Sequence, residues 1–137
     1  MKNPPNPELK KLLQTAKTIA VVGASDKPAR DSYHIMKFLI DHGYNVLPVN
    51  PAYNEILGKR CYPDLRQIEE QVDIVDIFRR SEEVLPVVQD AIIIGAPAVW
   101  MQLGVVNEEA ATVAQRAGLT VIMNRCIKIE YNALIDA

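Results

Sequence analysis

The chain has 137 residues, of which 49% are apolar and 23% charged, and this balance is that of an ordinary globular domain rather than a disordered chain. The formal net charge is −2 and no run of Lys and Arg occurs, so the sequence lacks the basic footprint of a nucleic-acid-binding protein. No apolar stretch approaches the roughly 20 residues that span a bilayer, and the polar start has no features of a secretory signal, so we expect a cytoplasmic protein without a membrane partner.

The first half of the chain predicts a polar lead-in followed by strand–helix units. The run Thr18–Gly23 predicts a buried parallel strand, since it is short, apolar and ends in glycine. Downstream, the pairs Ile35–Met36 and Leu39–Ile40 recur with the spacing of one helix face. The elements expected here are a lead-in over 1–15 with a brief helix over 8–15, a strand over 18–23, a helix over 31–42, a strand over 44–49 and a short helix over 65–70.

The second half continues the same alternation. Val72–Phe78 is apolar except for Asp73 and Asp76 and predicts a third strand. The remaining expected elements are a helix over 81–94, a strand over 98–103, a helix over 107–117, a strand over 119–123 and one helical turn after 126.

Strand and helix alternate throughout, which is typical of a parallel sheet covered on both faces. We therefore predict an α/β, Rossmann-like, doubly wound fold with a five-stranded parallel sheet in the order 3-2-1-4-5, and a single domain over residues 1–137. In such sheets ligands bind beyond the carboxyl ends of the strands, so the segments that follow the strands are the informative ones.

The segment after the first strand is the main candidate for a phosphate site. Gly23 lets the backbone turn tightly and approach a ligand, while the next helix points its free N–H groups at the same place. Ser25 and Lys27 would add a hydroxyl and a positive charge. On this hypothesis a valine at position 23 abolishes binding while the fold survives. The alternative is that Gly23 only makes a strand-to-loop turn.

Two nucleotide-binding motifs are missing from the sequence, and their absence narrows the class of ligand. A dinucleotide site of the NAD type expects the pattern G-x-G-x-x-G, but Ser25 and Pro28 occupy the second and third glycine positions. The second strand ends in Val49–Pro51, with no carboxylate for the ribose hydroxyls, and the P-loop pattern is also missing. An NAD(P)-binding regulator is therefore the least favoured alternative.

Four segments together resemble the small stand-alone CoA-binding domain proteins. These segments are Val21–Pro28, Val49–Pro51, Trp100–Gly104 and Asn124–Cys126, and the similarity runs in order from about residue 16 to residue 130. That family is similar in fold to the CoA-binding domain of the succinyl-CoA synthetase alpha subunit and of nucleotide-diphosphate-forming acyl-CoA synthetases. The resemblance implies a domain that binds coenzyme A or an acyl-CoA.

The resemblance also implies which residues contact the ligand. In the synthetases a lysine lies two residues beyond the proline after the second strand, whereas this chain has Tyr53 there, so Arg30 or Arg79 would supply the charge for the 3′-phosphate. The predicted set consists of Gly23, Ala24, Ser25, Lys27 and Pro28 at the phosphates, Asn50 and Pro51 near the adenosine, Phe78 and Arg79 beside the pyrophosphate and adenine, Met101, Gln102 and Leu103 along pantetheine, Asn124 and Cys126 near the thiol, together with Arg30 and Tyr53.

We predict no catalytic residues and no metal site in these 137 residues. His34 and His42 fall in the first long helix and at its end, where surface or packing roles are expected. Asp73 and Asp76 lie three apart on one strand and so face opposite sides, which makes them poor partners. Cys126 has two interpretations: a thiol that forms a mixed disulfide with coenzyme A, or a partly buried small apolar side chain.

The function predicted from the sequence is coenzyme A binding by a non-catalytic carrier, sensor or regulatory module. The main alternative is a CoA-dependent enzyme completed by a partner chain. The small-molecule ligand is the one partner that the sequence itself points to.

Overall fold

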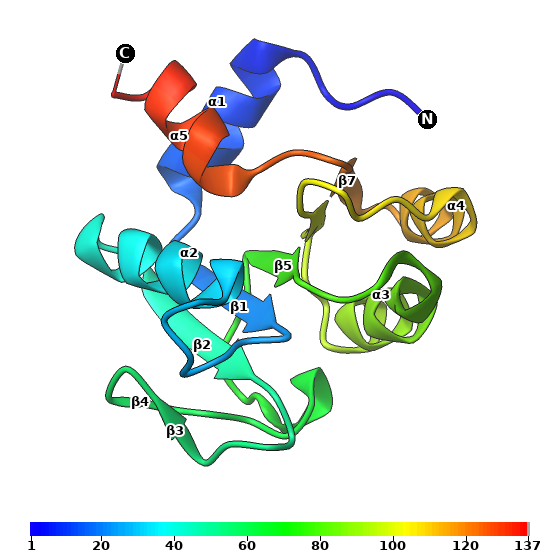
Figure 1. The fold of residues 1–137 in the computed structure, drawn as a ribbon. Helices are drawn as coiled ribbons and strands as arrows, with labels where there is room; N and C mark the ends of the chain where they lie inside the picture. The colour runs from blue at the N-terminus through cyan, green and yellow to red at the C-terminus, as the bar shows by residue number, and fades with distance from the viewer. Residues whose placement is uncertain (137) are drawn as a thin grey trace.

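The computed structural model describes residues 1–136, and a five-stranded parallel sheet lies at its centre (Figure 1). In order across the sheet, the strands are β2 (Asn45–Val49), β1 (Thr18–Val22), β5 (Ile74–Ile77), β6 (Ala98–Met101) and β7 (Thr120–Ile122). Every residue of β1, β5 and β6 is buried, because both faces of the sheet are covered. This double coverage explains why these strands appear in the sequence as continuous apolar runs.

Helices cover the two faces separately, as Figure 1 shows. The helices α1 (Asn6–Thr15), α2 (Asp31–Asp41) and α5 (Ile127–Leu134) pack on one face, and α3 (Val84–Ile93) and α4 (Glu108–Arg116) pack on the other. Met36 and Trp100 belong to the first of the two resulting cores, whereas Val88 and Met101 belong to the second. In the described part of the chain, no helix has the length and apolar character needed to cross a membrane.

The predicted class of fold is confirmed, and one strand lies elsewhere than expected. The sheet is parallel, has five strands and carries helices on both faces. The prediction placed the third strand of the chain beside the second. In the structure that strand, β5, pairs with β1, and β2 lies at the edge of the sheet.

Pro48 gives the physical reason for this edge position. It lies within β2 and has no N–H, so it cannot donate to the ladder of a neighbouring strand and is unsuited to the middle of a sheet. On its free side β2 meets only a short segment: the Tyr62 N–H donates to the Pro48 carbonyl at 2.9 Å, and the Asn50 N–H donates to the Tyr62 carbonyl at 2.9 Å. Pro48 was thus a sequence signal that the predicted strand order overlooked.

Asp73 fixes the start of β5 beside β1. Its carboxylate accepts the N–H groups of Lys17 and Thr18 at 2.8 and 2.9 Å. Its own N–H donates to the Thr18 carbonyl at 2.9 Å. The β1–β5 pairing is therefore specified by a side chain as well as by the backbone ladder.

Other differences concern short or terminal segments. The stretch after β2 contains a small hairpin, β3 (Glu55–Ile56) and β4 (Lys59–Arg60), that was not predicted. The expected helical turn after residue 126 is a helix of eight residues, α5. The lead-in is fastened to the sheet, because the Asn3 side chain donates to the Met123 carbonyl at 2.9 Å and accepts the Met123 N–H at 2.7 Å.

Candidate functional site

A cavity of about 720 Å³ lies beyond the carboxyl ends of β1, β5 and β6. From β1 the chain leads to β2 on one side, and from β5 it leads to β6 and β7 on the other, so the sheet changes direction between β1 and β5. Ligands of doubly wound folds bind at such a switch point. The volume is within the range of small-molecule sites.

Gly23 forms the turn at the end of β1, and its backbone conformation requires glycine. Its φ is +86°, in the left-handed region that other residues avoid. A Cβ at this position would collide with the carbonyl oxygen of Phe78, which follows β5. Glycine is therefore needed for the fold itself, which corrects the expectation that a valine here would leave the fold intact.

The N-terminus of α2 borders the cavity through Ala29, Arg30, Asp31 and Ser32. Arg30 is the N-cap residue and has extended backbone, but its side chain makes no capping hydrogen bond. A helix N-terminus carries free N–H groups and the positive end of the helix dipole, both of which favour an anion. The carboxylate of Asp31 is the acidic group among the lining residues and opposes part of this effect.

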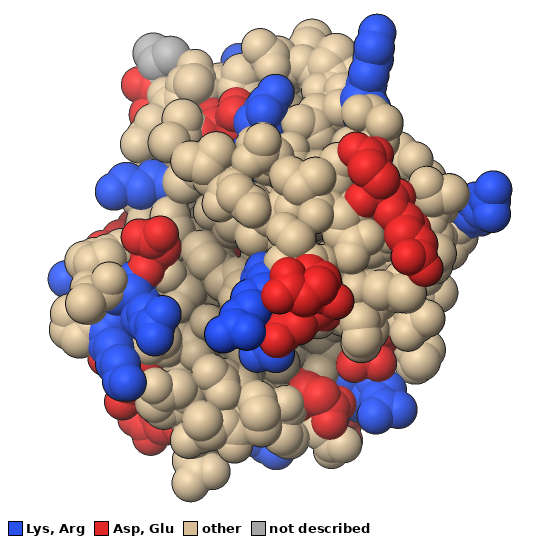
Figure 2. Space-filling model, turned by 45° about the vertical axis from the view of Figure 1, so that its right-hand side comes forward, with Lys and Arg blue, Asp and Glu red and all other residues tan. Residues whose placement is uncertain are grey.

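Four Arg and Lys side chains line the cavity: Arg30, Arg79, Arg80 and Lys128. Arg79 forms an ion pair with Glu83, with 2.7 Å between Nη2 and Oε2. Within residues 1–136 the other three form no ion pair, so their charges are available to a ligand. Figure 2 shows Lys and Arg side chains on either side of a hollow in this face of the molecule. The cavity of this acidic protein therefore favours a polyanion.

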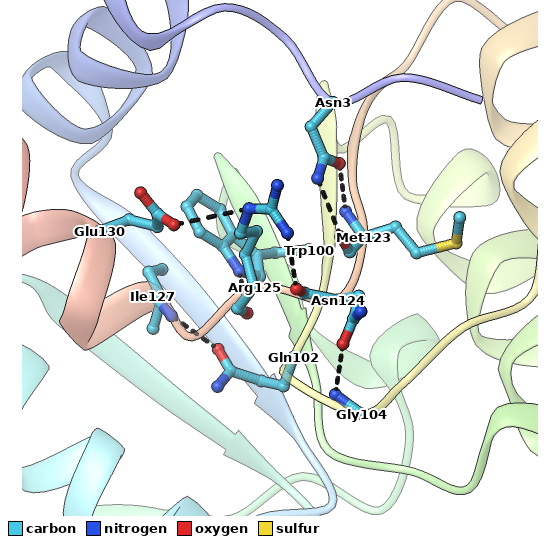
Figure 3. A network of polar contacts seen from close by, with 9 residues as sticks. All are labelled: Asn3, Trp100, Gln102, Gly104, Met123, Asn124, Arg125, Ile127 and Glu130. Atoms are coloured by element: carbon cyan, nitrogen blue, oxygen red, sulfur yellow. Dashed lines mark hydrogen bonds and ion pairs between the residues drawn. The ribbon is translucent and has the colours of Figure 1, made fainter.

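A hydrogen-bond network holds the chain after β7 against the end of β6 (Figure 3). The Trp100 indole N–H donates to the Arg125 carbonyl at 2.9 Å, and the Ile127 N–H donates to Oε1 of Gln102 at 3.1 Å. The Gly104 N–H donates to Oδ1 of Asn124 at 2.8 Å. Asn124 has a φ of +61° and so makes the turn that leads into α5. These contacts place Cys126, which is half-buried, in the cavity wall.

The structure brings seven of the sixteen predicted site residues together in the cavity lining: Gly23, Arg30, Phe78, Arg79, Gln102, Leu103 and Cys126. Five others belong to the same two segments of the chain as lining residues but do not line the cavity. Ala24 and Ser25 are buried in the loop, and Oγ of Ser25 accepts the N–H of Lys27 at 3.1 Å. Lys27 and Pro28 are exposed, and Asn124 serves the network described above. The role of each toward a ligand stays a prediction.

Asn50 connects the end of β2 to the loop after β1. Its side-chain amide donates to the Ala24 carbonyl at 2.8 Å, and its Oδ1 accepts the Ala52 N–H at 2.9 Å. Pro51 is exposed, and Tyr53 is half-buried against the core of the α2 face. These residues lie outside the cavity lining, as does Met101, whose side chain is fully buried in the core of the α3 face.

Sequence reasoning did not place several lining residues in the site. Most of them belong to the first turns of two helices, where spacing alone does not reveal which side faces a ligand. Arg80 is absent from the predicted set, although it follows Arg79 directly in the segment after β5. The lining residues outside the predicted set are Ala29, Asp31, Ser32, His34, Ile35, Arg80, Val105, Lys128 and Ile129.

The two aspartates of β5 do not form a catalytic pair. Asp73 accepts the backbone hydrogen bonds that hold β1 and β5 together. Asp76 is fully buried between its neighbours Val21 on β1 and Trp100 on β6, and within residues 1–136 neither of its carboxyl oxygens has a hydrogen-bond partner. Burial raises the pKa of the Asp76 carboxyl well above its ordinary value, because desolvation favours the protonated, uncharged form.

Comparisons with known proteins agree with this architecture. The uncharacterized protein YneT of Bacillus subtilis is 44% identical over 131 residues, which are 96% of this chain and 97% of that protein. The solved structure of a hypothetical protein from Pyrococcus horikoshii OT3 superimposes with a TM-score of 0.95 at 39% identity and covers 98% of this chain and 97% of that one. Acetate–CoA ligase I (ADP-forming) of Archaeoglobus fulgidus is 32% identical over 123 residues.

The ligase match covers 81% of this chain but 18% of the ligase, so it concerns one region of a much longer protein. The family model described as CoA binding domain matches residues 17–132, which include all five strands and every residue of the cavity lining. The chain therefore belongs to the CoA binding domain family.

Proposed function

We propose that this protein binds coenzyme A in the cavity beyond β1, β5 and β6, as a non-catalytic carrier, sensor or regulatory module. The observation that carries the proposal is the combination, in one cavity, of a helix N-terminus, the Gly23 turn and four cationic side chains. Coenzyme A is a polyanion with a long neutral arm, and charge-assisted hydrogen bonds from Arg and Lys favour its phosphates. Membership of the CoA binding domain family supports the same ligand.

In this proposal the two ends of the cavity bind different parts of the ligand. The phosphates lie against the turn at Gly23 and the N-terminus of α2, within reach of Arg30 and Arg79. Pantetheine follows Gln102, and the thiol points toward Cys126. The adenosine extends toward the end of β2, where Asn50 contacts the loop after β1 and Tyr53 follows three residues later.

A second candidate function is that of a CoA-dependent enzyme completed by a partner chain. The match to part of an acetate–CoA ligase favours it, since this chain corresponds to less than a fifth of that protein. The two candidates differ in assembly. Gel filtration of the protein purified from its own cells would reveal a stable heteromeric complex if a partner supplies the catalytic residues.

The test of the proposed function is a calorimetric titration of the ligand-stripped protein with coenzyme A, with NAD as the control. Saturable binding of coenzyme A without a response to NAD is the expected result. Binding of NAD without binding of coenzyme A would overturn the proposal. It would point to an NAD(P)-binding regulator, although β2 ends without the carboxylate that such a site uses.

A further inference from the structure

Two large apolar side chains in the cavity wall are left open to solvent. Leu103 is 63% exposed and Ile129 is 59% exposed, and both line the cavity, as does the largely buried Val105. Among residues 1–136 the other large exposed apolar side chains are Met1, Ile93 and Val106, and none of them lines the cavity. Single exposed apolar residues are common on protein surfaces, but two in the wall of one cavity indicate an apolar part of a ligand.

The segments that carry these side chains are held in place. Leu103 lies between Gln102, which accepts the Ile127 N–H, and Gly104, which donates to Asn124 (Figure 3). Ile129 lies in the first turn of α5, directly after the segment that Trp100 and Gln102 bind. A preorganised apolar wall loses little side-chain freedom when a ligand covers it, so such coverage favours affinity.

Charge and apolar surface are separated along the edge of the sheet. The arginines of the lining follow β1 and β5, whereas Leu103 and Val105 follow β6, and Ile129 comes after β7. The strand order places β6 and β7 on the far side of β5 from β1. The cavity thus fits a ligand with phosphates at one end and an apolar group at the other.

Building on the proposed coenzyme A site, we propose that the preferred ligand is an acyl-CoA thioester with an apolar acyl group of a few carbons, which covers Leu103 and Ile129. The phosphates and pantetheine bind as they do in free coenzyme A. The acyl chain adds contact with the two exposed side chains, and each methylene fully removed from water adds about a fourfold gain in affinity.

Lys128 offers a competing interpretation, because this residue also lines the cavity and its positive charge would attract the carboxylate of a dicarboxylic acyl group. The structure favours the apolar chain for two reasons. The Lys128 ammonium lies over the Phe38 ring, 5.5 Å from its centroid, so it already has a favourable contact. In contrast, the side chains of Leu103 and Ile129 have most of their surface in water.

The experiment is a calorimetric titration of the full chain with four ligands: coenzyme A, acetyl-CoA, butyryl-CoA and succinyl-CoA. We expect butyryl-CoA to bind on the order of tenfold tighter than coenzyme A, and acetyl-CoA to lie between them. Tighter binding of succinyl-CoA than of butyryl-CoA would overturn the inference in favour of an acidic acyl group at Lys128.

Three variants locate the acyl group. Leu103→Ser and Ile129→Ser each remove apolar surface from the wall, and each is expected to reduce the ratio of butyryl-CoA affinity to coenzyme A affinity severalfold. Ile93→Ser is the matched control, because Ile93 is 66% exposed at the end of α3 and does not line the cavity; its ratio should equal that of the parent protein. If neither Leu103→Ser nor Ile129→Ser lowers the ratio of butyryl-CoA affinity to coenzyme A affinity, the inference is overturned.

The failure of the inference is distinguishable from that of the proposed function. If coenzyme A binds and butyryl-CoA binds no tighter, the acyl preference is refuted while the coenzyme A site stands. If none of the four ligands binds, the proposed function itself is refuted, and the inference with it.

Discussion

At the scale of single residues, Asp76 is the least expected feature of the core. It lies on a central strand, is fully buried, and has no hydrogen-bond partner for either carboxyl oxygen within residues 1–136. An unpaired charge in such surroundings costs several kcal/mol, so the folded protein keeps the carboxyl protonated. The pKa of Asp76 is therefore raised by burial, and this has a direct consequence for stability.

The stability of the protein should fall as pH rises because of Asp76. In the unfolded chain the carboxyl ionises near its ordinary pKa of about 3.9, whereas the folded state holds the proton to a much higher pH. Between these two pKa values the folded state binds more protons than the unfolded chain does. The stabilisation that protonated Asp76 gives to the folded state is therefore fully present below a pH of about 4. It is lost at about 1.4 kcal/mol per pH unit as the pH rises toward the folded-state pKa.

The variant Asp76→Asn tests this linkage, since the amide has nearly the same shape and does not ionise. Urea unfolding of both proteins at pH 5, 6, 7 and 8 should show the variant gaining stability relative to the parent as the pH increases. Parallel pH profiles of the two proteins would mean that Asp76 is ionised or has a partner in the folded state.

A second residue-scale prediction concerns Gly23. We expect Gly23→Ala to lower the free energy of unfolding by roughly 2–4 kcal/mol, because the new Cβ meets the Phe78 carbonyl in addition to the strain of a positive φ. Gly118→Ala is the control: its φ is +88° and no atom lies near the added Cβ, so it should cost only about 1 kcal/mol. Equal losses in urea unfolding would show that the β1 and β5 ends can move apart.

At the scale of elements, the C-terminal helix α5 contributes more to the site than its sequence indicated. The helix α5 has eight residues, too few for stability on its own, and of its residues only Ile127 is buried. It forms because Gln102 and Trp100 form hydrogen bonds with the backbone of Ile127 and Arg125 at and just before its start. In addition, Tyr131 packs edge-to-face against Phe38. Such contacts join segments that are distant in the chain, so periodicity could not reveal them.

The segment before α1 is held in a similar way by Met123, the residue directly after β7. Asn3→Ala removes both hydrogen bonds to the Met123 backbone and should lower the free energy of unfolding by about 1–2 kcal/mol. The control is Asn132→Ala on α5, whose side chain is exposed and forms no hydrogen bond within residues 1–136. Chemical denaturation of the two variants provides the comparison, and a loss no larger than that of the control would show that the segment is dispensable.

At the scale of the whole molecule, the cavity gathers cations from three elements in a protein whose net charge is −2. Arg30 comes from the start of α2, Arg79 and Arg80 follow β5, and Lys128 belongs to α5. These three elements are far apart in the chain, and only the fold brings their charges to one place. The proposed coenzyme A site thus depends on the local field of the cavity and not on the overall charge.

The salt dependence of binding reports on this field. We expect Arg30→Ala to weaken coenzyme A binding by roughly tenfold at low ionic strength and by less at high ionic strength, because salt screens exposed charges. Arg116→Ala, at the end of α4 and outside the cavity lining, should leave the affinity unchanged. Calorimetry at two salt concentrations measures both, and an equal loss for Arg30→Ala at both would contradict a phosphate contact.

The sequence by itself determined the class of fold and the approximate place of the five strands of the sheet, whereas the loop after Gly23 as a phosphate site stays a prediction. These conclusions rest on local properties: apolar runs of strand length, helical spacing and the conformational freedom of Gly23. The resemblance of four strand-end segments to CoA-binding domain proteins agrees with the family model over residues 17–132. Pro48 already disfavoured a central position for β2, but the pairing of β5 with β1 involves contacts of Asp73 with a distant segment, which only the tertiary structure showed.

The tertiary structure also decided which side chains face the cavity. Lys128 and Ile129 enter it because α5 packs back across the sheet, and Met101 is excluded because its strand turns it to the opposite face. Asp76 is buried without a partner for the same reason: alternation along β5 directs it into the core of the α2 face. The orientation of a side chain depends on contacts between distant segments, whereas the tendency of a segment to form a strand or a helix depends on the residues of that segment.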